Sequence, residues 1–332
     1  MNNPVAMAEV WRGEFLECVH VGHAVVCDAS GNIVQAWGDP DAVILPRSSC
    51  KMIQALPLIE SGAADAFGLT QDQLALSCAS HQAAAIHTDR VQTWLANLGL
   101  SDEDFRCGPQ MPNDWDAKQT LIKGDQSPCR YHNNCSGKHS GFLTTTKHLK
   151  AGPEYVDLSH PLQLAVREAF EDVTRIDSPG FGIDGCSAPN FATTVHGLAR
   201  AMGFFAAARD DGPLRNRAAA RLVEAMMAYP ELVAGEGRAC TDLMRAMGGN
   251  VALKGGAEGV YVAILPEKGL GVALKIRDGA SRGSECAIAA ILVSLGALDA
   301  NDPVLDKWMD VKQRNFDGLE TGYLRPAIGF PN

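Results

Sequence analysis

The sequence predicts a mixed α/β (α+β) fold, in which strands from both chain ends form one mainly antiparallel sheet flanked by helices. Residues 19–38 alternate apolar and polar side chains around a turn at residues 29–32. Residues 259–265 and 270–276 flank a second turn, and both patterns are typical of β-hairpins. Between the hairpins, apolar residues recur at helical spacing. The steady strand–helix alternation of a doubly wound fold is therefore not expected.

The chain has 332 residues, of which 46% are hydrophobic, enough for a sizeable core. We expect a single domain, residues 1–332. Its sheet region is predicted at about residues 1–45 and 250–332, and its helical region at about residues 46–249.

The predicted helices follow from apolar residues repeated every three or four positions. The first helix is expected at residues 48–62, where Pro57 would kink it because proline lacks the amide hydrogen that a helix needs. Residues 107–121 are rich in Pro, Asp and Asn and are predicted to be mostly loop, and residues 151–161 are predicted to connect two helices. Further helices are predicted at residues 88–98, 161–173, 191–208, 215–229, 238–247 and 284–295.

Charge and cysteine usage restrict the partners and the compartment. The chain carries 29 Lys and Arg against 39 Asp and Glu, a net charge of -10, which argues against nucleic acid and anionic membranes as partners. No apolar run reaches the roughly 18–20 residues that span a bilayer, and the N-terminus does not resemble a secretory signal. The ten cysteines include no Cys-x-x-Cys pair. We therefore expect reduced thiols and a cytoplasmic location.

Two motifs resemble nucleotide-binding sequences without fitting their structural context. Gly180-Phe181-Gly182-Ile183-Asp184-Gly185 matches Gly-x-Gly-x-x-Gly, but its flanks do not predict the strand before it and the helix after it that a dinucleotide site needs. The Gly137-Lys138 pair lacks the preceding glycine of a phosphate-binding loop. Nucleotide binding is not expected.

Ser48 and Lys51 form a Ser-x-x-Lys motif at the start of the first predicted helix. Residues three apart lie on one helix face, so the lysine nitrogen can reach the serine oxygen. A serine hydroxyl is a weak nucleophile until a base removes its proton, and a neutral lysine can be that base. Alone, the motif also fits a helix-capping serine beside a solvated lysine.

Two later elements favour a catalytic interpretation. Ser80 follows the end of a helical pattern at residues 74–78, and Lys254-Gly255-Gly256 precedes the second hairpin. A Ser-x-x-Lys motif, then a second serine, then a Lys-x-Gly element is the order found in serine β-lactamases and penicillin-binding proteins. Those enzymes also pack helices on an antiparallel sheet built from both chain ends.

Cys135, Lys138 and Cys186 lie in two polar, Gly-punctuated segments. Two thiolates and a nitrogen would suit zinc, although a lysine must lose a proton before it can bind a metal. Cys135 and His139, four residues apart, could instead form a nucleophilic pair. Buried structural cysteines are the third interpretation, and spacing does not separate the three.

Taken together, four motifs resemble the rhizobial-type (class 3) L-asparaginases over nearly the whole chain. They are Pro46-Arg47-Ser48-Ser49-Cys50-Lys51, Cys78-Ala79-Ser80-His81, Asn134-Cys135-Ser136-Gly137-Lys138-His139 and Asp184-Gly185-Cys186-Ser187-Ala188-Pro189. The resemblance implies a serine-β-lactamase-like fold, a homodimer, and hydrolysis of L-asparagine to L-aspartate and ammonia.

The resemblance also implies roles for individual residues. It implies two Ser–Lys pairs, Ser48 with Lys51 and Ser80 with Lys254. It implies one zinc ion per subunit near the substrate. The implied zinc ligands are Cys135, Lys138 and Cys186, and the implied substrate-binding residues are Arg47, His139 and Asp184.

Two other functions remain open from the sequence. Asparagine and glutamine differ by one methylene, which gives a site only about 1–3 kcal/mol of discrimination, so a glutaminase or another β-lactamase-like amidohydrolase is the first alternative. The second is a catalytically inactive, zinc-stabilised binding protein. The presence of all four Ser and Lys residues favours an enzyme over that alternative.

Overall fold

The computed structural model describes residues 3–332, which form two compact units. The sheet unit comprises Met1–Ser49, Thr193–Ala207 and Asp242–Asn332. The helical unit comprises Cys50–Ala192 and Ala208–Thr241. The predicted mixed α/β class is confirmed, whereas the prediction of one domain stays a prediction.

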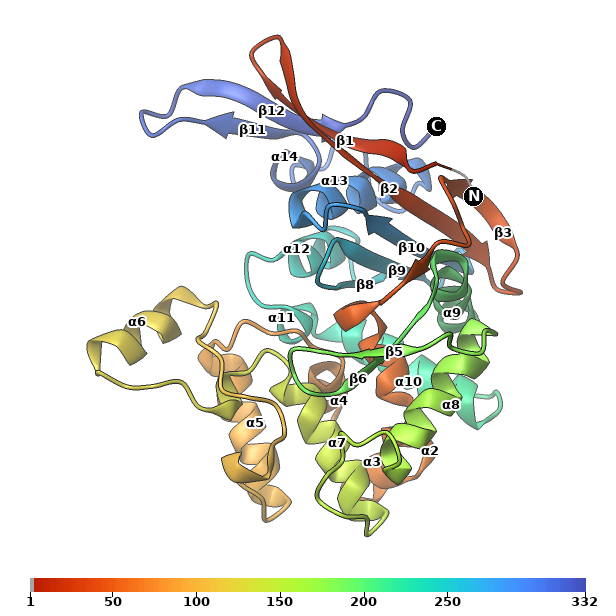
Figure 1. Cartoon of the computed structure of the whole chain (residues 1–332), viewed down its shortest axis with the longest axis vertical. Helices are drawn as coiled ribbons and strands as arrows, with labels where there is room; N and C mark the ends of the chain where they lie inside the picture. The colour runs from red at the N-terminus through yellow and green to blue at the C-terminus, as the bar shows by residue number, and fades with distance from the viewer. Residues whose placement is uncertain (1–2) are drawn as a thin grey trace. The chain divides into compact units, whose positions relative to one another are not determined.

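Strands from both chain ends form the eight-stranded sheet of the sheet unit, as predicted (Figure 1). Its order within the described residues is β11-β12-β1-β2-β10-β9-β8, with β3 also paired to β2. Every pairing in it is antiparallel. The strands are β1 (Val5–Arg12), β2 (Phe15–Asp28), β3 (Ile33–Trp37), β8 (Ala252–Gly255), β9 (Val260–Leu265), β10 (Leu270–Ile276), β11 (Val311–Arg314) and β12 (Glu320–Pro326).

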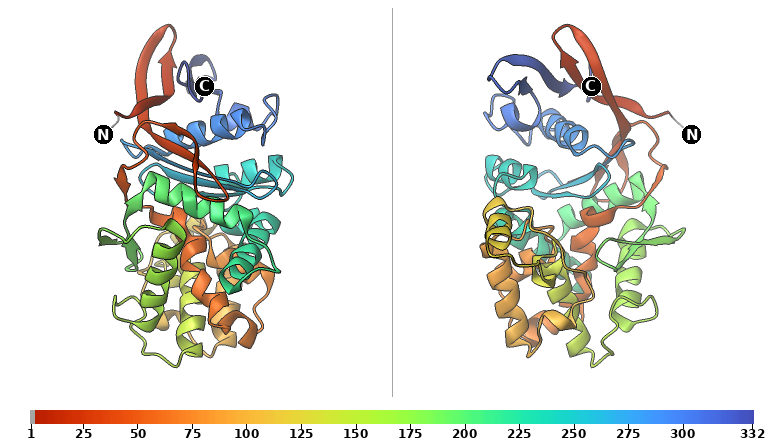
Figure 2. Two further views of the ribbon diagram at one scale, coloured as in Figure 1. Left: turned by 90° about the vertical axis from the view of Figure 1, so that its right-hand side faces the viewer. Right: turned by 60° about the vertical axis from the view of Figure 1, so that its left-hand side comes forward.

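β2 joins the two ends of the chain. It pairs with β1, Val5 lying opposite Gly22, and with β10, Val26 lying opposite Val272. Residues 24–27 of β2 are all fully buried. Such a continuous buried run arises where both faces of a sheet are covered. Here α9 (Val195–Ala207) packs on one face and α13 (Ser281–Ser294) on the other (Figure 2).

Glycine allows α9 to approach the sheet closely. A Cβ atom added at Gly271 of β10 would overlap the backbone of Met202 and Gly203 in α9. A Cβ added at Gly203 would in turn overlap the carbonyl of Asp28 in β2. The helix backbone therefore rests directly on the backbone of two central strands.

The remaining elements of the sheet unit are short. β4 pairs with β7 in a separate two-stranded sheet. The elements are β4 (Val43–Ile44), β7 (Thr193–Thr194), α14 (Leu305–Trp308) and the 3-10 helix η1 (Arg47–Cys50). The last residue of η1 is assigned to the helical unit, and α12 (Ala239–Ala246) has residues in both units.

The helical unit is built around α7 (Ser136–His148), whose residues 136–146 are all buried. α7 packs against α2 (Leu56–Glu60), α4 (Gln71–Ser77) and α5 (Ala85–Asn97). Its buried face nevertheless carries Ser, Lys, His and Thr, so these polar groups need partners inside the unit. The other elements are α1 (Lys51–Gln54), α3 (Ala63–Ala66), η2 (Asp102–Asp104), α6 (Trp115–Lys123), η3 (Arg130–His132), α8 (Pro161–Thr174), β5 (Phe181–Ile183), β6 (Pro189–Phe191), α10 (Leu214–Ala228) and α11 (Pro230–Val233).

Two local predictions were only partly right. The helix expected at residues 48–62 is three pieces, η1, α1 and α2, and the break precedes Pro57 in the first turn of α2, a position that needs no amide hydrogen. The loop expected at residues 107–121 contains the start of α6, because the Asp114 carboxylate accepts the Ala117 N–H at 2.9 Å and caps that helix.

Other differences are smaller. The predicted hairpin at residues 19–38 is β2 and β3, but β1, β11 and β12 were not identified individually. The predicted helical region also holds the small β5–β6 sheet, in which residues 181–183 are followed by a turn and a strand rather than a helix. No helix of the described chain is both long enough and apolar enough to cross a membrane.

The close approach of α9 to the sheet gives the first prediction. Gly271→Ala should lower the free energy of unfolding by about 1–3 kcal/mol, because the added methyl group must push two backbones apart. Urea denaturation measures this change. Gly152→Ala is the control, because a Cβ there meets nothing within 4 Å. Equal denaturation midpoints for the two variants would contradict the close approach.

Candidate functional site

Lys51 lies at the centre of a group of buried polar contacts in the helical unit. It is the first residue of α1 and is 1% exposed. Its Nζ lies 3.0 Å from Ser80 Oγ and 3.1 Å from Cys135 Sγ, and it also donates to the Ala79 carbonyl. A lysine amine in hydrogen-bond contact with a serine hydroxyl is placed to exchange a proton with it.

The backbone around Ser80 is fixed on both sides. Ser80 lies three residues beyond the end of α4, and its N–H donates to the Val233 carbonyl at 2.9 Å. The next N–H, that of His81, donates to the Asn134 carbonyl at 3.1 Å. These bonds tie the loop to α11 and to the segment before α7, so Ser80 has a defined position beside Lys51.

The sheet unit holds three predicted site residues, Arg47, Ser48 and Lys254. Lys254 is the last residue but one of β8, is 1% exposed, and donates from Nζ to the Gly255 carbonyl at 2.7 Å. A Cβ at the following Gly256 would lie 2.8 Å from the carbonyl oxygen of Pro46. The Ser48 turn and the end of β8 therefore touch.

Arg47, next to Ser48, has unusual backbone geometry. Its φ of 53° lies in the left-handed region, which is costly for a residue with a Cβ. Its guanidinium lies 3.9 Å from the Glu258 carboxylate. Strained residues of this kind are concentrated at functional sites.

Each predicted Ser–Lys pair combines a residue of the sheet unit, Ser48 or Lys254, with a residue of the helical unit. Within the helical unit, the observed contact joins Lys51 to Ser80. The pairing of Ser48 with Lys51 and that of Ser80 with Lys254 stay predictions.

The predicted metal-ligand residues lie together inside the helical unit. Cys135 immediately precedes α7 and Lys138 lies in its first turn, so a single helical turn presents both. Lys138 Nζ lies 3.2 Å from Cys186 Sγ. Cys186 lies in a tight turn closed by the Ser187 N–H on the Asp184 carbonyl at 2.8 Å.

Burial makes these residues influence one another's ionisation. A hydrogen bond from Cys135 and the positive charge of Lys138 lower the pKa of Cys186 well below that of a free thiol, although burial opposes this. The same hydrogen bond raises the pKa of Cys135. Burial disfavours the Lys138 ammonium, but the two sulfurs outweigh it and raise its pKa. The result is a buried thiolate–ammonium pair beside a neutral thiol.

His139 and Asp184 border this pair. His139 is fully buried, and its Nδ1 lies 2.8 Å from the Tyr155 hydroxyl. Burial, followed by the charge of Lys138, lowers its pKa to about 4. Asp184 is half-buried, accepts the Gly185 N–H at 2.9 Å, and contributes to the raised pKa of Lys138.

The donor types around Cys186 fit zinc. Zinc prefers thiolate and nitrogen ligands, and two sulfurs and one amine meet here in a buried position. Lys138 would have to release a proton to bind the metal. Among residues 3–332, no three His, Cys, Asp or Glu side chains gather as metal ligands.

Sequence reasoning missed two features of this region. It paired Lys51 with Ser48 and did not anticipate its contact with Cys135. It also assigned residues 151–161 only a connecting role, although Tyr155 is fully buried and contacts His139. A lone tyrosine in a Pro- and Gly-containing segment was the only available signal.

The sequence of the L-asparaginase II family matches residues 8–326, which is nearly the whole chain. The chain belongs to this family. The match supports an amidohydrolase of the asparaginase type, acting on a small molecule. No significant match was found among curated proteins.

Several solved structures are similar to the chain at low identity. Mglu in its native form is 14% identical with a TM-score of 0.47, over 85% of this chain and 65% of that chain. A putative β-lactamase from Bacteroides dorei DSM 17855 is 12% identical with a TM-score of 0.44, over 77% and 85%. A β-lactamase from Mycobacterium bovis is 12% identical with a TM-score of 0.44, over 82% and 94%. The chain thus spans about two thirds of the length of Mglu, and its family membership rests on the sequence match.

A second buried histidine makes stability depend on pH. His81 is 1% exposed, accepts the Ala83 N–H on Nδ1 at 3.2 Å, and lies 2.9 Å from Ser136 Oγ through Nε2. Burial, then the neighbouring His87 and Lys51, lower its pKa well below 6.5. The folded protein therefore holds His81 neutral.

Acidification should consequently destabilise the protein through His81. The unfolded chain binds a proton at His81 below about pH 6.5 and the folded chain does not, so stability is lost as the pH falls below that value. Between pH 7.5 and 5.5 this contributes about 1.4 kcal/mol. Urea denaturation at both pH values should show a larger loss in the wild type than in His81→Gln. An equal loss would show that His81 takes up its proton in the folded state.

Proposed function

We propose that the chain hydrolyses L-asparagine to L-aspartate and ammonia through an acyl-enzyme formed on Ser48. The family match over residues 8–326 carries this proposal. The contact between Lys51 and Ser80 at 3.0 Å supports it, because Ser–Lys catalysis needs a buried amine in hydrogen-bond contact with a hydroxyl.

In the proposed mechanism, Ser48 Oγ attacks the side-chain amide carbon of asparagine while neutral Lys51 removes the hydroxyl proton. Ser80, in contact with Lys51, passes a proton to the departing nitrogen, and Lys254 completes this second relay. The carbon–nitrogen bond then breaks and ammonia leaves. The β-aspartyl ester on Ser48 is hydrolysed by water, which restores the serine.

The substrate is held at its α-carbon end in this proposal. The Asp184 carboxylate binds the α-ammonium and the Arg47 guanidinium binds the α-carboxylate, each by a charge-assisted hydrogen bond. His139 of α7 is proposed as a further substrate-binding residue on the resemblance to class 3 asparaginases. Charged groups that bind the α-carbon end in this way would fix the side-chain amide relative to the nucleophile.

A zinc ion held by Cys135, Lys138 and Cys186 is part of the proposal. Zinc would supply positive charge that orients polar groups of the substrate.

The ten cysteines are free thiols, which supports a cytoplasmic location. We also propose a homodimer, on the resemblance to class 3 asparaginases alone. Light scattering of the purified protein measures its mass and tests the proposed dimer.

The nucleophile can be tested with two adjacent serines. Ser48→Ala should reduce ammonia release from L-asparagine by roughly 10³-fold or more, because no other hydroxyl takes its place. Ser49→Ala is the matched control, since the Ser49 hydroxyl bonds the Pro46 carbonyl at 2.7 Å and serves the local turn. A coupled assay for ammonia, run in parallel on L-glutamine, measures both.

The outcomes of that assay separate the candidate functions. Turnover of asparagine that survives in Ser48→Ala would refute the proposed nucleophile. Turnover of glutamine alone would replace the substrate, and no turnover of either would favour the inactive binding protein.

Zinc binding is tested by metal content. Elemental analysis of protein dialysed against zinc should give about one zinc per chain, and Cys186→Ala should lose most of it because a thiolate ligand is gone. Cys27→Ala is the control, since Cys27 is also fully buried but lies in β2 of the sheet unit. Equal zinc content in both variants would rule out Cys186 as a ligand.

A further inference from the structure

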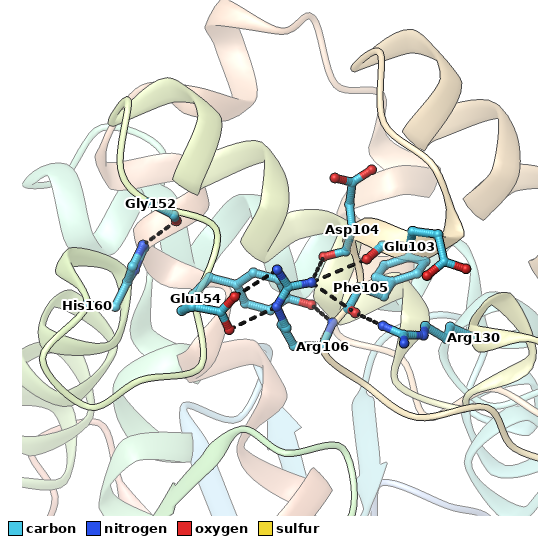
Figure 3. A network of polar contacts seen from close by, with 9 residues as sticks. Glu103, Asp104, Phe105, Arg106, Arg130, Gly152, Glu154 and His160 are labelled. Carbon is cyan, nitrogen blue, oxygen red and sulfur yellow. Dashed lines mark hydrogen bonds and ion pairs between the residues drawn. The ribbon is translucent and has the colours of Figure 1, made fainter.

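A clamp around Arg106 fixes the loop between η2 and α6 (Figure 3). The guanidinium donates two hydrogen bonds to the Glu154 carboxylate, from Nε at 3.0 Å and from Nη2 at 2.9 Å. Its Nη1 donates to backbone carbonyls of residues 103–105, the shortest bond being 3.1 Å to Asp104. A bidentate arginine–carboxylate pair restricts orientation as well as distance. The main chain at Arg106 is therefore held firmly.

The segment that carries Tyr155 is held equally well. His160 accepts the Leu162 N–H on Nδ1 at 3.1 Å, so its Nε2–H donates to the Gly152 carbonyl at 3.0 Å. Gln163 donates to the Tyr155 carbonyl at 2.8 Å. Tyr155 itself is fully buried and lies edge-on to His139, with ring centroids 5.5 Å apart.

Two hydrogen-bond partners meet at the Tyr155 hydroxyl. The Arg106 backbone N–H donates to it at 2.7 Å, and an amide N–H can only donate. The other partner is His139 Nδ1, at 2.8 Å. Burial raises the pKa of Tyr155, so the hydroxyl keeps its proton.

Counting protons at this oxygen determines the state of His139. The hydroxyl carries one proton, and the Arg106 N–H already occupies a lone pair, so the hydroxyl must donate to His139 Nδ1. A proton on Nδ1 would leave the buried hydroxyl with two donors facing it and no acceptor for its own hydrogen, which is costly. Nδ1 is therefore bare, and the proton of the neutral ring sits on Nε2.

The remaining nitrogen of the His139 ring is Nε2. Nε2 is buried and has no partner at standard hydrogen-bond geometry within residues 3–332. The nearby sulfur of Cys186 interacts with this ring, and that interaction contributes to the lowered pKa of Cys186. A ring nitrogen that carries a proton cannot bind a metal, but it can donate to a thiolate.

We propose that Tyr155 is a positioning residue that holds His139 in its Nε2–H tautomer, which makes His139 a hydrogen-bond donor toward Cys186 and not a metal ligand. The tautomer does not depend on the reaction. The statement that His139 is not a zinc ligand rests on the zinc site of the proposed function. Hydrogen bonds to metal ligands orient them and tune their affinity.

The tautomer can be read directly by nitrogen NMR on metal-free protein with ¹⁵N-labelled histidine. His139→Gln identifies the His139 signals by their loss. The wild type should show Nε2 protonated and Nδ1 bare at His139. Protonated Nδ1 in the wild type would overturn the inference, whatever the protein's activity or metal content.

Tyr155→Phe tests the cause, because it removes the hydroxyl and keeps the buried ring. The His139 signals should then show the proton shared with Nδ1. Tyr131→Phe is the matched control, since Tyr131 is a nearby tyrosine that packs on Phe105 at 5.8 Å and should leave the His139 signals unchanged. Unchanged signals in Tyr155→Phe would refute the role of Tyr155.

Zinc affinity provides an independent measurement, made by competition with a chromophoric chelator. Tyr155→Phe should bind zinc about 10-fold more weakly than the wild type, the effect expected of a lost outer-shell partner. Tyr131→Phe should bind it equally well. Tighter binding in Tyr155→Phe would indicate that the freed Nε2 had become a ligand, which contradicts the inference. A wild type that binds no zinc would refute the proposed metal site, and the NMR result would still decide the tautomer.

Discussion

The pairing of Lys138 with Cys186 is the constraint on which the rest of the helical unit's polar interior depends. Lys138 is only 3% exposed, and an unpaired ammonium there would cost several kcal/mol. The Cys186 thiolate offsets that cost, but only if the first turn of α7 and the turn at residues 184–188 stay within about one hydrogen-bond length. The same geometry brings Cys135 toward Lys51, and Lys51 to Ser80. A local electrostatic requirement thereby fixes the relative positions of four chain segments.

Histidine protonation in this unit follows from backbone geometry. His81 and His160 each accept a backbone N–H on Nδ1, and Tyr155 performs the same task at His139. At His81 and His160 the donor is an amide N–H, which can only donate, and at His139 the Arg106 N–H leaves the Tyr155 hydroxyl to act as the donor, so each ring is restricted to one tautomer. The interior is therefore polar yet has defined proton positions, as expected of a preorganised site rather than a core that happens to contain polar residues.

How much the sequence predicted depended on whether the signal was local. The β9–β10 hairpin and α8 were predicted nearly to the residue, because turn residues and helical periodicity lie within each element. α6 was missed because its composition suggested a loop, although Asp114 and Gly124 mark its two ends.

The site residues show the same limit. Motifs along the chain drew attention to residues of the helical unit, but the contact of Lys51 with Cys135 joins residues 84 positions apart. Tyr155 was overlooked because its partners, Arg106 and His139, approach it only in the folded chain. Spacing along the chain predicts neighbours on one helix, but not which loop will cover them.

The two-ended sheet has a consequence for how the protein is made. β2 pairs with β1, its neighbour in sequence. The partner of its other edge is β10, and the second partner of β1 is β12, near the end of the chain. On the ribosome, the first strands emerge long before their partners, while the helices of residues 50–192 can fold from local contacts. The nascent hairpin thus presents open, apolar edges for most of synthesis, and strand mispairing at those edges is the hazard that its folding has to avoid.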